Sequence, residues 1–401
     1  MGGTKLSKFF ENYLTQNPIF LNKKSLQSNY TPESTPHREE QVEELATILA
    51  PALRMEKPSN VFIYGKTGTG KTCVTQHVMQ QIFDVAKKKN LKLKYYYLNC
   101  KLKKVADTEY RLIAQLARAF GNEVPSTGLP TEEVYRSFIK GIDNENQLVI
   151  LILDEIDQLV TKAGDGILYN LTRLNSELTK CQISIIGISN DLMFTENLDP
   201  RIKSSLSEEE LVFPPYNAIQ LQDILKQRGV LAFQKDALEN GVIEKCAAYA
   251  AREHGDARRA LELLRVAGEL AERKNESKIK LIHLDEAEEK IEKDRIVDTV
   301  RTQPKQFQIT LYSILNVCDD NNKISTGEVY DFYKKICNQV NLKPLTQRRI
   351  SDIINEFDML GIINSKVISK GRYGRTREIM VAIHPSTFPQ IKSILKEGLG
   401  L

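Results

Sequence analysis

The sequence predicts an α/β domain built on a parallel sheet, then a small all-helical domain, then a domain of three helices and a β-hairpin. Between residues 61 and 212, short β-rich runs alternate with longer helical stretches, a pattern typical of parallel strands joined by crossover helices. No convincing strand follows in 209–293, and 295–401 has three helical stretches before two strand candidates. We therefore expect three domains, at residues 1–208, 209–293 and 294–401.

The composition is that of an ordinary globular protein, with 41% hydrophobic and 27% charged residues in 401. No apolar run approaches the ~20 residues of a membrane span, and residues 1–12 lack the apolar core of a secretory signal. The six cysteines are scattered, without a Cys-x-x-Cys pair, which argues against a zinc site and a disulfide framework. We expect a protein of the reducing cytoplasm that contacts no membrane.

Charge is distributed unevenly along the chain. The net charge is +4, yet residues 301–401 contain 15 Lys or Arg against 9 Asp or Glu. A basic C-terminal region on a near-neutral body favours a polyanionic partner at that end. Solubilising surface cations would give the same count, so composition alone leaves both interpretations open.

The first elements precede and form the sheet. Residues 1–35 are polar, and we expect them to pack as an extended arm. Pro36 and the acidic residues after it suit the first turn of a helix, and apolar residues then recur at helical spacing as far as Leu49. The strand candidates are residues 61–64, 93–98, 149–153 and 183–188.

Helices fill the second domain and open the third. The candidates are residues 219–230, 242–253, 257–274, 308–318, 327–340 and 345–360. Thr346 can cap the last of these helices, and Gly361 can end it in a left-handed conformation. Strand candidates at 362–368 and 377–383 follow. Three helices and then a hairpin is the element order of a winged helix.

A glycine-rich loop lies between the first strand and the helix after it. Strand, glycine loop and then Lys-Thr opening a helix is the context of a P-loop, whose backbone N–H groups surround a polyphosphate. Lys71 would reach the β- and γ-phosphates and Thr72 would hold Mg²⁺; an ordinary glycine turn before a helix is the alternative. The loop consists of Gly65, Lys66, Thr67, Gly68, Thr69, Gly70, Lys71 and Thr72.

Two acidic residues end the apolar strand at 149–153. Asp154 would coordinate Mg²⁺, directly or through water, and Glu155 would orient and polarise the attacking water. A solvated acidic turn is the alternative, but the position about 80 residues after the glycine loop favours the catalytic interpretation.

Three further polar residues are candidates for nucleotide chemistry. Asn190, at the end of the next strand, could hold the attacking water, or could be a turn residue. Arg201 could act on a neighbouring subunit's nucleotide, or be an exposed charge. Arg258 could close a helical lid onto the phosphates, or pair with Glu262 on its own helix. The small residues around Arg258 favour the first of these two interpretations.

The third domain offers a DNA-binding surface. The start of its third helix presents the residues that a recognition helix turns to base edges and phosphates, and the hairpin loop is basic, with Tyr373 placed to wedge or stack. Solvated surface, or a protein-binding winged helix, is the alternative. The candidates are Thr346, Gln347, Arg348, Arg349, Ser351, Lys370, Arg372, Tyr373 and Arg375.

Together these motifs resemble the AAA+ ATPases of the initiator clade. The matching segments are the glycine loop, Asp154-Glu155, Ser189-Asn190 and the segments at 198–201 and 255–260. The closest likeness is to archaeal replication initiators, which are similar to both the eukaryotic origin recognition complex and its cell-division-cycle helicase-loading partner. It covers the chain from about residue 30 to the end, including the order of ATPase, helical lid and winged helix.

The resemblance implies roles for individual residues. Asn190 would be the first sensor and Arg258 the second, and Arg201 would lie in the arginine-finger segment. The segment Pro36, His37 and Arg38 matches one that lies near the adenine. A helical insertion that touches origin DNA should fall within residues 108–130, near 121–130.

The function we predict is an ATP-dependent DNA replication initiator with ATP or ADP and Mg²⁺ as cofactors. It would bind origin double-stranded DNA at the nucleoid and help to recruit or load the replicative helicase. Family members often hold ADP tightly, which implies a slow switch. Its partners would be other initiator paralogues and the minichromosome maintenance helicase.

The alternatives are a nucleotide-gated winged-helix transcription regulator and a clamp-loader-like or mobile-element ATPase, which generally lacks the C-terminal winged helix.

Overall fold

A computed structural model of the chain describes residues 18–27, 30, 32, 34–101, 108–125, 128–206, 208–318, 324–369, 375–383 and 387–401. The structure divides into two units, Met1–Leu284 and Asp285–Leu401. All six cysteines lie in the described part and are thiols rather than disulfides.

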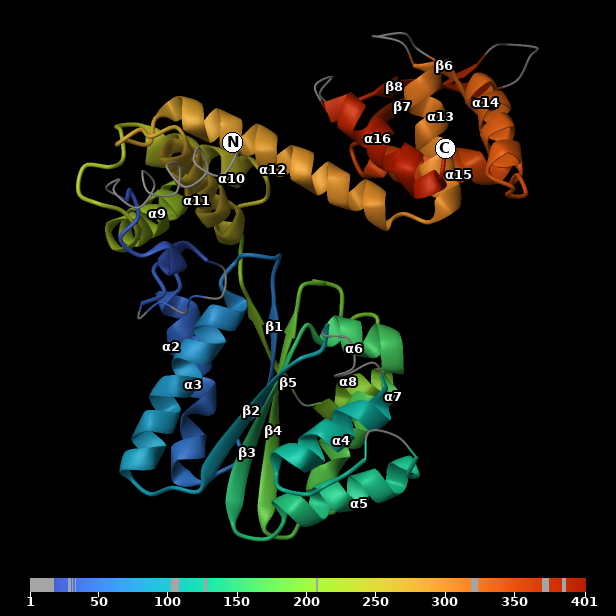
Figure 1. Cartoon of the computed structure of the whole chain (residues 1–401). Helices are drawn as coiled ribbons and strands as arrows, with labels where there is room; N and C mark the ends of the chain where they lie inside the picture. Colours follow the sequence, from blue (N-terminus) through green and yellow to red (C-terminus); the bar gives the residue numbers. More distant parts are fainter. Residues whose placement is uncertain are drawn as a thin grey trace, which may run out of the picture. The chain divides into compact units, whose positions relative to one another are not determined.

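The first unit contains a five-stranded parallel sheet with the order β2-β3-β4-β1-β5 (Figure 1). All residues of β1 and β3 are buried, as expected for parallel strands covered on both faces. The four predicted strands are confirmed. The strands are β1 (Asn60–Tyr64), β2 (Leu93–Asn99), β3 (Gln147–Asp154), β4 (Cys181–Ser189) and β5 (Glu208–Val212).

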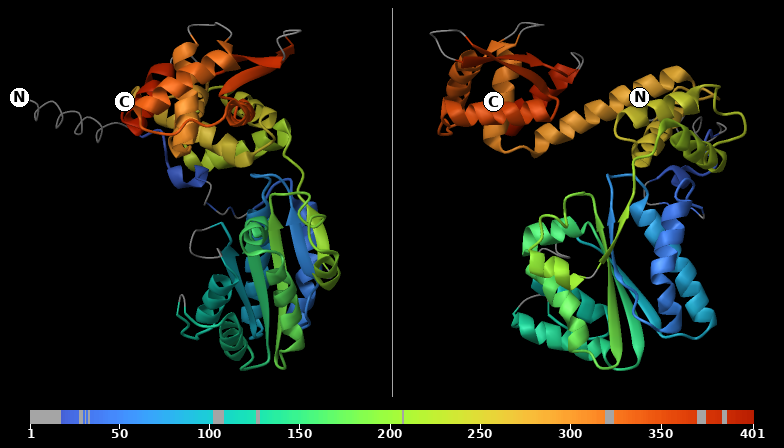
Figure 2. Two further views of the ribbon diagram at one scale, coloured as in Figure 1. Left: turned by 90° about the vertical axis from the view of Figure 1, so that its right-hand side faces the viewer. Right: turned by 180° about the vertical axis from the view of Figure 1, so that it is seen from behind.

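Alternate strand residues face opposite helical layers, because successive side chains of a strand point to opposite sides. Ile150 and Ile152 of β3 pack in the core beside α2 (Glu39–Leu49) and α3 (Lys71–Lys88), and Figure 2 shows these two helices together on one side of the sheet. Leu151 and Leu153 pack in the core of the other layer. That layer contains α4 (Glu109–Ala119), α5 (Thr131–Ile142), α6 (Ile156–Ala163), α7 (Gly166–Arg173) and α8 (Pro200–Leu206).

Strand β5 corrects the expectation that no strand lies in 209–293. It pairs in parallel with β1 over its whole length. Its first three residues are glutamates, and Glu209 and Glu210 are exposed. An edge strand tolerates such charges because one side of it faces water, so a search for apolar runs misses it.

A helical part follows the sheet in the first unit. The predicted helices are confirmed as α9 (Ala218–Ala232), α10 (Val242–Arg252) and α11 (Ala257–Arg273), and the unpredicted α12 (Leu281–Thr302) begins at its end. Residues 18–27 pack on this part and contain the short 3₁₀ helix η1 (Lys23–Leu26). The rings of Phe20 and Phe233 lie 4.9 Å apart, and the backbone N–H of Ile19 donates to Glu272 at 2.9 Å.

The second unit contains three predicted helices, α13 (Lys305–Val317), α14 (Thr326–Gln339) and α15 (Gln347–Met359), with a sheet ordered β6-β8-β7. Thr346 caps α15 by accepting from the N–H of Arg349, and Gly361 has a φ of +70°, as predicted. The hairpin consists of β7 (Ile363–Ser369) and β8 (Arg375–Val381). The unpredicted elements are β6 (Ile324–Ser325) and α16 (Phe388–Leu399).

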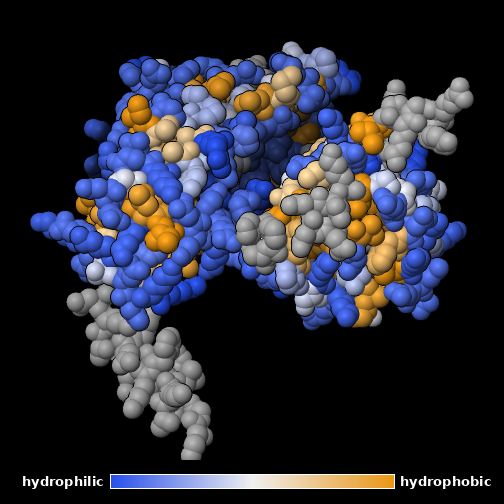
Figure 3. Space-filling view, turned by 90° about the horizontal axis from the view of Figure 1, so that it is seen from above, coloured by the Kyte–Doolittle hydropathy of each residue, from blue (hydrophilic) through white to orange (hydrophobic). Residues whose placement is uncertain are grey.

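The face drawn in Figure 3 is mostly hydrophilic, with separate apolar areas. Among the described residues, the most exposed large apolar side chains include Val230 at 78% and Met359 at 80%. No described helix combines the length and apolar character needed to cross a membrane.

Candidate nucleotide-binding site

A cavity of about 620 Å³ lies in the first unit at the carboxyl ends of the strands. Its walls come from the glycine loop, the tips of β2, β3 and β4, the segment before α2, and helices α9 and α11. This volume is in the range of ligand pockets. The predicted site residues that line it are Pro36, Gly68, Thr69, Gly70, Lys71, Thr72, Asp154, Glu155, Asn190 and Arg258.

The glycine loop turns sharply into α3. Gly68 and Gly70 have φ values of +74° and +94°, which other residues rarely adopt, and Gly70 is the N-cap of α3. A Cβ on Gly68 would lie 1.7 Å from a carboxylate oxygen of Asp256, and Gly68 accepts a hydrogen bond from the N–H of Ala257 at 3.2 Å. The loop therefore contacts the start of α11 directly.

Lys71 is the buried cation of the site. Its ammonium donates to the carbonyl oxygens of Gly65 at 2.6 Å and Lys66 at 2.8 Å, and to the side-chain oxygen of Asn190 at 2.9 Å. Burial lowers its pKa to about 8, and the charge of Arg258 acts in the same direction. An anionic phosphate in the cavity would offset both effects.

Thr72 and Asp154 meet at the end of β3. The Thr72 hydroxyl donates to Oδ2 of Asp154 at 2.9 Å, and the Tyr97 hydroxyl donates to the same oxygen at 2.5 Å. Hydroxyl and carboxylate oxygens are ligands that Mg²⁺ accepts, usually while it keeps several waters. These residues therefore fit the predicted metal site.

Glu155 follows immediately in a left-handed conformation, with φ +55° and ψ +47°. This is an uncommon conformation for a residue other than glycine, and such strain clusters at functional sites. Its N–H donates to Asp154 Oδ1 at 2.9 Å, and its carboxylate lies 3.5 Å from the ammonium of Lys101. Glu155 lines the cavity together with the metal-ligand candidates Thr72 and Asp154, where a water-orienting residue would be needed.

The two arginines at the start of α11 have different surroundings. Arg258 lines the cavity, whereas Arg259 pairs with Glu253 at 3.0 Å. Asp256 caps the helix by accepting from the N–H groups of both arginines. Of the two, Arg258 is therefore the one placed to meet a nucleotide.

The three predicted residues before α2 differ in how they relate to the cavity. Pro36 lines the cavity, but His37 lies 3.1 Å from Asp223. Arg38 is buried outside the cavity lining, where its guanidinium donates to the carbonyl oxygen of Thr69 at 2.9 Å and stacks 3.9 Å from the ring centre of Tyr216. Arg38 therefore supports the glycine loop without lining the cavity.

Arg201 does not line the cavity of its own chain. It is 86% exposed and forms a 2.9 Å ion pair with Asp199. Its role on a neighbouring subunit stays a prediction.

Sequence reasoning missed Tyr97, Tyr216 and Arg228 at this site. Tyr97 stands in a run of three tyrosines, and strand alternation alone does not separate it from Tyr95, which shares its face. Arg228 lies in an ordinary amphipathic helix, and nothing in its local sequence marks it.

The candidate DNA-binding residues lie in the second unit. Residues 346–349 at the start of α15 are exposed, and Arg349 lies 3.8 Å from Asp352. Ser351 donates to the carbonyl oxygen of Gln347. Lys370, Arg372 and Tyr373 lie outside the described residues, as does the side chain of Arg375.

One helix, α4 (Glu109–Ala119), lies within residues 108–130, where we predicted a DNA-touching insertion. Helix α4 buries Leu112, Ile113 and Leu116 in the core of the unit. The described residues of 121–130 contain no helix. A DNA contact within residues 108–130 stays a prediction.

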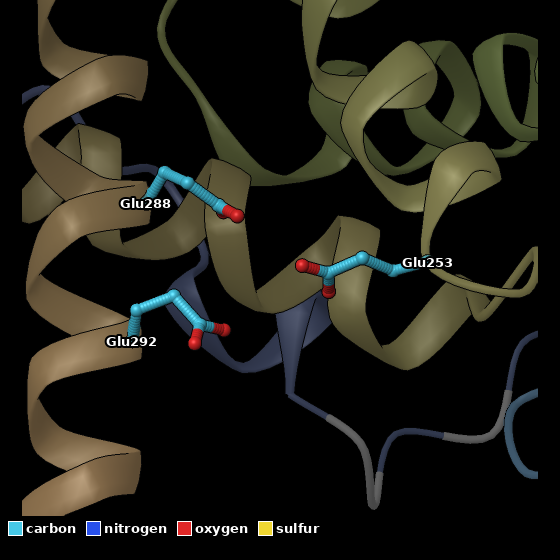
Figure 4. A group of neighbouring side chains, drawn as sticks. All are labelled: Glu253, Glu288 and Glu292. Atoms are coloured by element: carbon cyan, nitrogen blue, oxygen red, sulfur yellow. The ribbon is translucent and has the colours of Figure 1, made fainter. Parts of the chain in front are cut away.

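Three glutamates drawn in Figure 4 define no metal site. Glu288 and Glu292 project from successive turns of α12, and Glu253 pairs with Arg259. Glu253 belongs to the first unit and the other two to the second, so the structure does not place the three carboxylates relative to one another.

Three family models match consecutive parts of the chain. They are an AAA domain over residues 54–192, the Cdc6 AAA+ ATPase-type lid domain over 222–289 and the CDC6 C-terminal winged helix domain over 298–389. The predicted fold class is confirmed.

Close relatives decide the family. The ORC1-type DNA replication protein 1 of Archaeoglobus fulgidus is 55% identical over 370 residues, 92% of this chain and 90% of that protein. The chain therefore belongs to the ORC1-type DNA replication protein family. The structure of the Aeropyrum pernix ORC1 protein in complex with DNA has a TM-score of 0.82 at 45% identity, and the match covers 95% of this chain and 98% of that one.

Membership of the ORC1-type family confirms the predicted resemblance to archaeal replication initiators. A more distant match is the Aeropyrum pernix ORC2 protein, solved as ADPNP-ADP complexes, with a TM-score of 0.60 at 21% identity over 95% of this chain and all of that one. This match shows the shared fold alone. The AAA domain places the chain among the AAA+ ATPases.

Proposed function

We propose that this ORC1-type protein binds ATP or ADP with Mg²⁺ in the cavity, and that the nucleotide sets how it engages origin double-stranded DNA. The observation that carries the proposal is that Lys71, Asp154 and Arg258 line one cavity. Arg258 comes from the helical part, whereas Lys71 opens α3 and Asp154 ends β3 in the part that contains the sheet. A triphosphate between them would attract both cations and hold the two parts together.

The residues of the cavity divide the chemistry between them. Thr72 and Asp154 would hold Mg²⁺, which when bound would neutralise charge on the phosphates. Glu155 would orient water for hydrolysis and Asn190 would hold that water near the terminal phosphate. Hydrolysis would be slow, so that the bound nucleotide acts as a switch rather than as fuel for continuous work.

Nucleotide binding is tested with two substitutions. Lys71→Ala should abolish binding, since the phosphates lose their buried cation. Glu155→Gln should keep binding but block hydrolysis, because the amide does not polarise water as a carboxylate does. The measurements are the nucleotide that co-purifies with each variant and its ATPase rate. Wild-type ADP occupancy in Lys71→Ala would refute the assignment.

The exposed start of α15 supports DNA binding through the second unit, as does the structural relative solved with DNA. Removing Arg348, or Arg372 and Arg375 of the hairpin, should weaken DNA binding. Each lost phosphate contact should also lower the slope of log affinity against log salt by about one unit. Lys335→Ala on the exposed face of α14 is the control. An unchanged salt slope in the arginine variants would contradict a role for these residues.

Recruitment of the minichromosome maintenance helicase and pairing with initiator paralogues belong to the same proposal. The exposed Arg201 would reach the nucleotide of a neighbouring subunit. The relatives' shared name in DNA replication favours this role over a transcription regulator.

A further inference from the structure

We infer that Arg228 is a nucleotide-binding residue, and that its guanidinium donates a hydrogen bond to the nucleoside part of the bound nucleotide. The inference rests on the proposed function, because it needs a nucleotide in the cavity. None of the sequence motifs assigns Arg228 a role. Its position on α9 would make the helical part sense the nucleoside as well as the phosphates.

The first observation is an unsatisfied cation. Atom Nη1 of Arg228 is buried and has no hydrogen-bond partner among the described residues. A buried polar group without a partner costs free energy, and a charged one costs more. Arg228 lines the cavity, so a ligand there is the available source of an acceptor. Burial also lowers the pKa of the guanidinium, in keeping with its lack of a counter-ion.

The second observation is that Arg228 is held in place. Its guanidinium lies 4.5 Å from the ring centre of Tyr30, a stacking geometry that favours the cation. Tyr30 also lines the cavity. Stacking fixes the plane of the guanidinium and leaves its edge to donate hydrogen bonds.

The third observation concerns the part of the nucleotide that Arg228 meets. The phosphates belong at the glycine loop and Lys71, where Arg258 also lines the cavity. Arg228 instead lines the cavity from α9, together with Tyr30 of the segment before α2. The wall around it comes from one face of α9 and is partly apolar, as a base requires. The residues of that face are Ile224, Gln227, Arg228 and Leu231.

The test compares Arg228→Met with the wild type, using ADP and adenosine as probes in calorimetric titrations. Methionine keeps much of the side-chain volume but removes the charge and the donors. We expect the affinity for both probes to fall by about 10-fold or more, since a charged hydrogen bond is lost. Lys226→Met, on the exposed side of the same helix, should bind both probes as the wild type does.

Thermal unfolding separates a ligand contact from a structural role. Without nucleotide, Arg228→Met should unfold at the same temperature as the wild type or higher, because an unpaired buried charge has been removed. With ADP, its stabilisation should be smaller than that of the wild type. A lower unfolding temperature without nucleotide, together with an unchanged ADP-induced shift, would assign Arg228 a structural role and overturn the inference.

The remaining outcomes are also decisive. Unchanged ADP affinity in Arg228→Met would refute the contact while leaving the proposed function intact. Weaker ADP binding with unchanged adenosine binding would place the contact on the phosphates and refute the nucleoside assignment. A wild-type protein that binds no ADP would instead refute the proposed function itself.

Discussion

Asp154 is held by three donors at the end of its strand. Thr72 and Tyr97 donate to Oδ2, and the N–H of Glu155 donates to Oδ1. The carboxylate is therefore oriented before any ligand binds. Residues that orient a metal ligand in this way influence metal affinity without touching the metal.

Tyr97→Phe should reduce the effect of Mg²⁺ on nucleotide binding. The ring remains but the donor to Asp154 is lost, so we expect the Mg²⁺ concentration for half-maximal ADP binding to rise about 10-fold. ADP binding without Mg²⁺ should stay unchanged, which a fluorescence titration with and without the metal would show.

The matched control is Tyr95→Phe on the same strand and face. Tyr95 packs edge-on against Phe83 with ring centres 5.3 Å apart, and phenylalanine preserves that contact. An unchanged Mg²⁺ requirement in Tyr97→Phe would show that Tyr97 does not position Asp154.

The sequence predicts the site residues that belong to a recognisable motif. It does not predict the residues that only the fold brings to the site. Lys71, Thr72, Asp154 and Asn190 line one cavity, because the glycine loop and the ends of neighbouring parallel strands meet at the same edge of the sheet. Arg38 also belongs to a predicted motif, but it is buried against the glycine loop, where it donates to the carbonyl oxygen of Thr69. Sequence spacing does not indicate this position.

At the scale of elements, one carboxylate links α5 to the start of β4. Asp143 is the C-cap of α5 and accepts from the N–H groups of Thr179, Lys180 and Cys181 at 3.0, 2.7 and 2.8 Å. Desolvation acts to raise its pKa, but these hydrogen bonds outweigh it and lower the pKa to about 2.

Asp143 should therefore contribute a pH-dependent part of the stability. Its pKa is lower in the folded than in the unfolded chain, so its contribution is complete above about pH 4 and is lost as the pH falls to about 2. Urea unfolding of the wild type and Asp143→Asn at several pH values would measure it. The difference between their midpoints should shrink across this window. A difference independent of pH would contradict the role of the charge.

The elements that sequence missed have identifiable physical reasons. Strand β5 carries three glutamates because it lies at a sheet edge, and α12 is rich in charged residues with a weak apolar period. Strand β6 is only two residues long and exists through its pairing with β8. In each case the tertiary neighbour, rather than the local pattern, decides the structure.

At the scale of the whole molecule, the cavity lies in the first unit and the predicted DNA-binding residues lie in the second. Helix α11 forms one wall of the cavity. Its residue Ala257 donates a hydrogen bond to the carbonyl oxygen of Gly68 in the glycine loop. Loss or gain of the terminal phosphate would change how strongly the nucleotide attracts the two cations Lys71 and Arg258 across that contact. The chain order of sheet, helical part and winged helix could be predicted because the order of elements differs: strands alternating with helices, then helices alone, then helices before a hairpin.

The central claim is tested most directly by selecting genomic DNA fragments with the purified full-length protein in ATP and in ADP. We predict that a small set of origin fragments is enriched, and that their recovery changes with the nucleotide in the wild type but not in Lys71→Ala. Recovery of promoter fragments in place of origins, or equal recovery in ATP and ADP, would contradict a nucleotide-controlled replication initiator.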